Sequence, residues 1–131
     1  MIDVEVIGGD AAPGGPARVE RLAALALRAA GVQDGHVAVE FVDAERIADL
    51  NAAHRGVEGP TDVLSFPVDE AMELPGPPSL RELGDVVICP EHTEDLSEAV
   101  VHGTLHLVGM DHETDQGEML ALQAEIVSWL R

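Results

Sequence analysis

The chain has 131 residues, with 25 acidic residues against 7 basic ones and a formal net charge of −18. This length suits a single domain, residues 1–131, whose core needs no disulfides, and the single Cys89 fits a reducing compartment. The acidic surplus argues against a protein that coats nucleic acid non-specifically, because such binding depends on neutralising phosphates.

The N-terminal half predicts two strands, each followed by a helix. Residues 2–7 alternate apolar and polar side chains, as a half-buried strand does. Residues 16–30 place their apolar side chains along one stripe at helical spacing. A second strand is expected at 37–41, after which Asp43 can cap a short helix. Residues 55–60 then form a glycine-flanked, turn-rich connection.

The C-terminal half predicts two more strands and two helices. Residues 63–66 suit a third strand, and the proline-rich segment 69–81 suits a mobile loop. Residues 86–89 are nearly all apolar and predict a buried strand. Apolar side chains at helical spacing favour a helix over 93–108. A final helix is expected from Asp115, where the sequence fits a capping box.

The predicted order of elements is βαβαββαα, with strands and helices interspersed. This order favours an α+β fold in which helices pack on a small, mixed four-stranded sheet. Trp129, near the end of the last helix, is expected to pack against the rest of the domain. Neither a signal pattern nor an apolar stretch of membrane-spanning length is found, so we expect a soluble, cytoplasmic protein with no membrane partner.

Three of the six histidines, His102, His106 and His112, fall within one short segment. A step of four places His102 and His106 on one face of the predicted helix. Gly109 can end that helix, because glycine readily adopts the left-handed conformation, and the reversed chain can carry His112 back towards the pair. Three neutral imidazoles around an open fourth position are the ligand set of a catalytic zinc ion. We therefore predict one Zn²⁺ ion on a helix of the C-terminal half.

A zinc ion held in this way lowers the pKa of its water to about 7, which serves peptide, amide or phosphodiester hydrolysis alike. Zinc peptidases with the pattern HExxHxxGxxH use the glutamate after the first histidine as general base. Gly103 occupies that position here, so peptide chemistry lacks its base. Phosphodiester cleavage gains instead from a cation near the phosphate. Arg55 is the candidate, because a guanidinium group binds phosphate through two hydrogen bonds.

These residues belong to a longer pattern that resembles the YbeY family of bacterial endoribonucleases. The family's HGxLHLxGYDH signature corresponds to HGTLHLVGMDH at 102–112. A second family block corresponds to Asn51-Ala-Ala-His-Arg55 followed by PTDVLSFP at 60–67. A third block, LGD with an apolar strand, corresponds to residues 83–89.

The resemblance implies a zinc-dependent, single-strand-specific endoribonuclease in rRNA processing, especially 16S rRNA 3′-end maturation, and in ribosome quality control. It implies zinc on His102, His106 and His112, and a substrate-binding role for Arg55. His102 and Arg55 are accordingly the candidate catalytic residues. The implied partners are single-stranded RNA, ribosomal RNA, proteins of the small ribosomal subunit and an assembly GTPase.

Two departures from the family pattern concern the surroundings of the metal. Met110 stands where the family has tyrosine, which removes a hydroxyl group or stacking ring. The segment between Cys89 and His102 is shorter than family members usually have. We therefore expect a truncated ligand-bearing helix and a more open wall beside the metal.

Two rival functions follow from the same residues. One is a metal-dependent peptidase or amidase, which Gly103 disfavours. The other is a non-catalytic, zinc-containing ribosome-assembly factor, and a closed structural site would need a fourth ligand such as Cys89. The sequence does not identify a general base: His54, beside Arg55, could serve, or it is a surface histidine. The nucleophile is open as well, since the RNA's own 2′-hydroxyl could attack in place of water. Asp111 is either a carboxylate that orients a histidine or a turn residue.

Overall fold

The structure is a computed structural model and describes residues 2–8, 15–67, 82–109 and 117–129. Its strands and α-helices follow the predicted order, with one short 3₁₀ helix added before α3. None of the described helices is long and apolar enough to cross a membrane. In chain order, the elements are β1 (Ile2–Ile7), α1 (Gly15–Ala29), β2 (Gly35–Phe41), α2 (Ala44–Arg55), β3 (Val63–Pro67), β4 (Glu82–Ile88), η3 (Pro90–His92), α3 (Leu96–Leu107) and α4 (Glu118–Trp129).

The strands of the described residues form one mixed sheet in the order β1-β2-β4-β3. β1 and β4 run parallel to β2, whereas β3 runs antiparallel to β4. Val39 in β2 pairs with Val6 on one side and with Val86 on the other, so β2 and β4 form the centre of the sheet. The mixed four-stranded sheet with packed helices confirms the predicted fold class.

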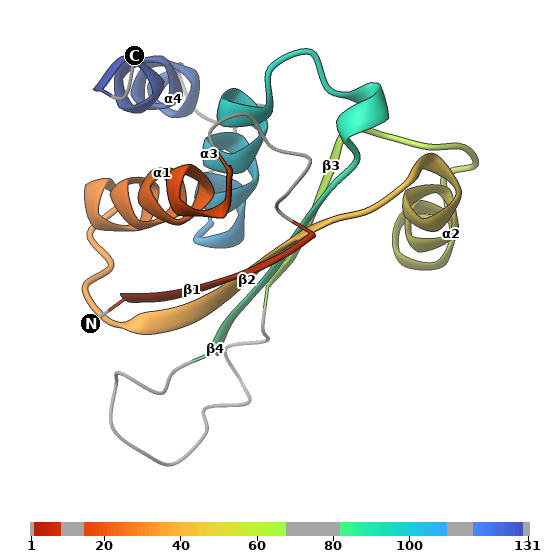
Figure 1. Ribbon diagram of the computed structural model, residues 1–131, viewed down its shortest axis with the longest axis horizontal. Coiled ribbons are helices and arrows are strands. Elements are labelled where there is room, and N and C mark those ends of the chain that lie inside the picture. The colour runs from red at the N-terminus through yellow and green to blue at the C-terminus, as the bar shows by residue number, and fades with distance from the viewer. Residues whose placement is uncertain (1, 9–14, 68–81, 110–116, 130–131) are drawn as a thin grey trace.

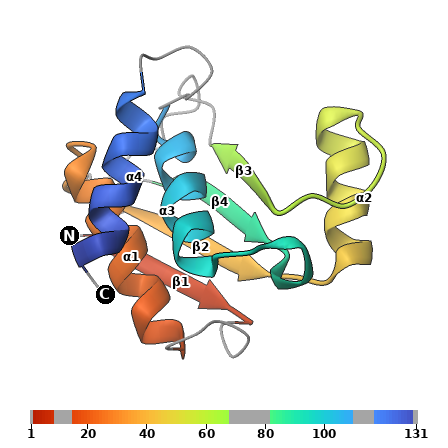
Figure 2. The ribbon, with the colours of Figure 1, turned by 90° about the horizontal axis from the view of Figure 1, so that it is seen from above.

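The helices cover the two faces of the sheet unequally (Figures 1 and 2). α1, α3 and α4 pack on one face, over the main apolar cluster to which Val86 and Ile88 contribute. α2 packs on the opposite face, over a smaller cluster that includes Leu64 and Val87. Successive side chains of β4 therefore point to opposite faces, as the strand geometry requires. As a result, α3 and α2 lie on opposite sides of the edge strand β3.

α3 approaches β3 and β4 closely because one of its residues is glycine. A Cβ atom on Gly103 would lie 2.5 Å from Cγ1 of Val86 and 2.9 Å from Cγ2 of Val63, both below an ordinary contact distance. At the same point, the Ser65 hydroxyl of β3 donates a hydrogen bond of 2.7 Å to the carbonyl oxygen of Gly103. The lack of a side chain at Gly103 lets the middle turn of α3 approach the sheet, and the Ser65 hydrogen bond holds it there.

Two element boundaries differ from the prediction. α3 begins at Leu96 rather than at 93, because residues 90–92 form a 3₁₀ turn and Asp95 then caps the α-helix. The Asp95 side chain accepts a hydrogen bond of 3.1 Å from the backbone N–H of Glu98. Arg55 is the last residue of α2 rather than part of the connection, since α2 continues until Gly56 adopts a positive φ of 69°.

The last helix agrees with the prediction on its inner face but not at its end. Met119 and Ile126 are buried, as expected. Trp129 does not pack into the domain as predicted, because half of its surface is exposed, 50%. The predicted loop 69–81 and the predicted helix start at Asp115 lie outside the described residues.

We expect Gly103→Ala to destabilise the protein by about 1–3 kcal/mol through overpacking against β3 and β4. A loss of stability would be informative, because alanine in a helix interior is otherwise favoured over glycine by about 1 kcal/mol. Urea unfolding measures the change. Ala53→Gly on the exposed side of α2 is the control and should lose about 1 kcal/mol, the propensity effect alone. A Gly103→Ala protein that is more stable than the wild type would contradict the close contact.

Candidate functional site

The structure places two of the three predicted metal ligands side by side. His102 and His106 lie one turn apart on α3, and both side chains are half-buried. Their ring centroids are 4.9 Å apart and the ring planes meet at 64°. Two imidazoles on one tetrahedral zinc ion, with Zn–N bonds of about 2.1 Å, have centroids roughly 5 Å apart. The pair therefore fits a shared ion.

A residue of α4 holds one of these rings. Nδ1 of His102 lies 2.8 Å from Oε1 of Gln123. An amide oxygen can only accept a hydrogen bond, so Nδ1 is the protonated nitrogen and donates. The lone pair of the neutral ring is then on Nε2, the nitrogen that would bind a metal. The sequence offered no signal for Gln123, because the contact joins two helices across 21 positions.

α3 ends just before Gly109, as predicted. The φ of Gly109 is 97°, a conformation that side chains with a Cβ rarely adopt, and its N–H donates to the carbonyl of His106 at 3.0 Å. The third expected ligand, His112, and the neighbouring Asp111 lie outside the described residues. Within the described ranges, no group of three or more His, Cys, Asp or Glu side chains could hold a metal.

Gly103, at the position of the peptidase glutamate, faces the sheet. The Cβ contacts with Val86 and Val63 show that a side chain there would point into the packed layer and push α3 away. The same backbone that carries His102 and His106 therefore excludes a glutamate at this position. The predicted lack of a peptidase base has a packing reason that spacing alone did not reveal.

Arg55 is exposed and is the last residue of α2. α2 lies on the other side of β3 from α3 (Figure 2). Asn51 lies one turn before Arg55 on α2, and its side chain is buried. The Asn51 amide nitrogen donates to the carbonyl of Gly59 at 2.9 Å, which ties down the connection after Arg55. Asn51 Oδ1 is buried without a hydrogen-bond partner among the described residues. Sequence analysis noted Asn51 only as part of a motif, and its structural role needs the fold.

Two further candidates belong to the α2 side of the sheet. Cys89 is fully buried in the smaller cluster, together with Ile47 and Leu64, where it acts as a small apolar side chain. This position puts it in a different layer from His102. The His54 ring packs on Phe66, with centroids 4.4 Å apart. Cys89 and the His54 ring therefore both have packing partners on the α2 side of the sheet.

A separate titratable cluster lies on the sheet face opposite α1 and α3. His36 of β2 has Nδ1 2.7 Å from Glu82, and its Nε2 is 3.5 Å from Glu5 and 3.9 Å from Asp3. Burial lowers the pKa of His36, but the Glu82 hydrogen bond and the negative charges of Glu82, Asp3 and Glu5 outweigh it and raise that pKa above 6.5. Burial, and then the charge of Glu82, raise the pKa of the Asp85 carboxyl above its usual value.

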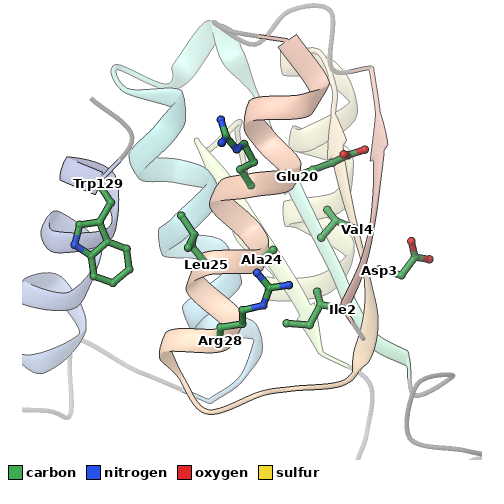
Figure 3. A pocket seen from close by; sticks show the side chains of 9 residues that line it. Ile2, Asp3, Val4, Glu20, Ala24, Leu25, Arg28 and Trp129 are labelled. Carbon is green, nitrogen blue, oxygen red and sulfur yellow. The ribbon is translucent and has the colours of Figure 1, made fainter.

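The exposed Trp129 borders a surface hollow of about 560 Å³ between β1, α1 and the end of α4 (Figure 3). Its floor is apolar and its rim carries charges of both signs. The lining residues are Ile2, Asp3, Val4, Glu20, Arg21, Ala24, Leu25, Arg28 and Trp129. Neither histidine of the pair lines this hollow, so it is distinct from the candidate metal site.

Comparison with known proteins decides the family. The model of a family described as Endoribonuclease YbeY matches residues 17–131. The chain belongs to the YbeY family. It is 38% identical to Endoribonuclease YbeY of Corynebacterium jeikeium over 139 residues, which covers 87% of this chain and 75% of the relative. It is 43% identical to Endoribonuclease YbeY of Rubrobacter xylanophilus over 100 residues, 74% of this chain and 69% of that one.

The YbeY relatives are longer than this chain. The match to Endoribonuclease YbeY of Corynebacterium glutamicum, 38% identical, spans 72% of this chain but only 58% of the relative. The fold is also similar to that of TM1509 from Thermotoga maritima, known from a solution structure. That similarity has a TM-score of 0.54 and 27% sequence identity, and it covers 98% of this chain and 87% of the other.

The raised pKa of His36 predicts a pH-dependent contribution to stability. A group whose pKa is higher in the folded state stabilises the fold fully below its unfolded value, and the effect is lost as pH rises through the folded value. We expect wild type to exceed His36→Gln in free energy of unfolding most at about pH 5.5, and the difference to shrink towards about pH 8.5. Urea unfolding of both proteins across this range measures it. A difference in free energy of unfolding that grows with pH would contradict the raised pKa of His36.

Proposed function

We propose that this protein is a zinc-dependent, single-strand-specific endoribonuclease of rRNA processing. Its task would be 16S rRNA 3′-end maturation and ribosome quality control in the cytoplasm. Membership of the YbeY family supports the activity. The observation that carries the proposal is the histidine pair of α3, whose rings lie at the spacing of two ligands on one ion. Proteins of the small ribosomal subunit and an assembly GTPase are the proposed partners.

The donor set fits zinc rather than a harder cation. Imidazole nitrogens suit zinc, whereas magnesium and calcium prefer oxygen ligands. His102, His106 and His112 would hold the ion and leave a fourth position open. When bound, zinc would supply positive charge for the phosphate and a water of lowered pKa. His102 would bind through Nε2, since its Nδ1–H is engaged by Gln123.

The protein's own groups would position the substrate. Arg55 would bind the scissile or an adjacent phosphate through its guanidinium group, from the end of α2. Asn51 supports that end of α2 through its bond to Gly59. Gly103 keeps a carboxylate out of the position where a peptidase holds its base, which favours phosphodiester over peptide substrates. The burial of Cys89 under α2 disfavours a closed structural zinc site.

Zinc content and cleavage of single-stranded RNA, measured for variants beside a peptide substrate, test the proposal. His106→Ala should lose both zinc and RNA cleavage. Arg55→Ala should keep zinc and cleave roughly 10²–10³-fold more slowly, the usual cost of removing one group that stabilises transition-state charge. Arg46→Ala is the matched control, because Arg46 is an exposed arginine on the same helix, and it should behave as wild type.

Three results would count against this function. Equal RNA cleavage by wild type and zinc-free His106→Ala would trace the activity to a contaminant. Loss of zinc in Arg55→Ala would show that Arg55 acts on the fold rather than on the phosphate. Hydrolysis of the peptide in place of RNA would favour the peptidase.

A further inference from the structure

We propose that Gln123 is a positioning residue that holds His102 in its metal-binding form. The inference rests on the proposed zinc site and extends it to α4, a helix that carries none of the proposed ligands. Gln123 would act through His102 and would not touch the substrate. Its effect would be to select one tautomer and one orientation of the ring before any ion arrives.

The hydrogen bond itself selects the tautomer. A neutral imidazole carries one proton, and the Gln123 oxygen can accept only from Nδ1–H at the observed 2.8 Å. Zinc binds a nitrogen with a free lone pair, which is then Nε2. Without the amide oxygen, the neutral ring would divide between two tautomers and rotate more freely. Part of the binding free energy would then be spent on reordering the ring.

The packing of α4 aims Gln123 at α3. Met119, Ile126 and Val127 are buried and lie four positions before, three after and four after Gln123. These spacings put all four side chains on one face of α4. α3 and α4 lie side by side in Figure 2, and both contribute to the main cluster. A polar side chain within such an apolar face is costly unless it is hydrogen-bonded, and His102 supplies the bond.

The acceptor oxygen matters more than the charge of the group that carries it. A carboxylate in place of the amide would accept from the same Nδ1–H and fix the same tautomer, as carboxylates often do behind zinc-bound histidines. Replacing Gln123 by glutamate should therefore preserve zinc binding, whereas losing the acceptor should weaken it.

Zinc affinity and the His102 tautomer test this role on the full chain. Zinc dissociation constants come from competition with a chelator, and long-range ¹H–¹⁵N NMR of the metal-free protein reports which His102 nitrogen carries the proton. We expect Gln123→Met to raise the zinc dissociation constant about 10–100-fold, the usual cost of losing a partner that orients a ligand. Gln123→Glu should retain near wild-type affinity at about pH 8. Glu125→Met is the control, because Glu125 is exposed on the same helix.

The outcomes separate this inference from the proposed function. If wild type and Gln123→Met bind zinc equally, Gln123 has no positioning role, although the zinc site stands. If the wild type binds no zinc, the proposed zinc-dependent function is wrong. The wild-type NMR spectrum needs no variant, and a His102 protonated on Nε2 would overturn the role of Gln123 even if Gln123→Met failed to fold. Urea unfolding of the metal-free proteins identifies any variant whose fold is damaged.

Discussion

The packing of the helices on the sheet depends on the close contact that α3 makes with β3 and β4 at Gly103. Because the glycine has no side chain, α3 lies against Val63 and Val86, and its carbonyl receives the Ser65 hydroxyl. α1 and α4 then pack beside α3 over the same cluster. A helix set farther out would change the height of the histidine pair above β3 and its distance from α4. One small residue thus sets both the layer spacing and the frame of the candidate site.

Part of the acidic surplus gathers in one cluster of the described residues. Asp3, Glu5 and Glu82 gather around His36 on the sheet face turned away from α1 and α3. Asp85 adds to that group, and its pKa is raised because burial and a neighbouring carboxylate both disfavour its ionised form. The repulsion within this cluster lies on the face opposite the histidine pair. The sheet therefore separates this group of carboxylates from the site proposed for a polyanion.

Much of the fold could be predicted because local periodicity and capping chemistry set it. The strand at 2–7, the cap at Asp43 and the helix end at Gly109 all agree with the structure. The failures have physical reasons. α3 begins later than predicted because residues 90–92 form a 3₁₀ turn. Arg55 belongs to α2 rather than to the predicted connection because the helix ends only where Gly56 adopts a positive φ. Trp129 is exposed because an apolar residue near a helix end need not face the core.

By itself, the sequence determined the histidine pair, since a spacing of four along a helix puts His102 and His106 together whatever surrounds them. It also determined that Gly103 could not act as a base. Only the tertiary structure decided that Gly103 must be small, that Gln123 of another helix holds His102, and that Cys89 lies in a different layer from the pair. These relations join residues far apart in the chain, and their contacts come from packing rather than from local spacing.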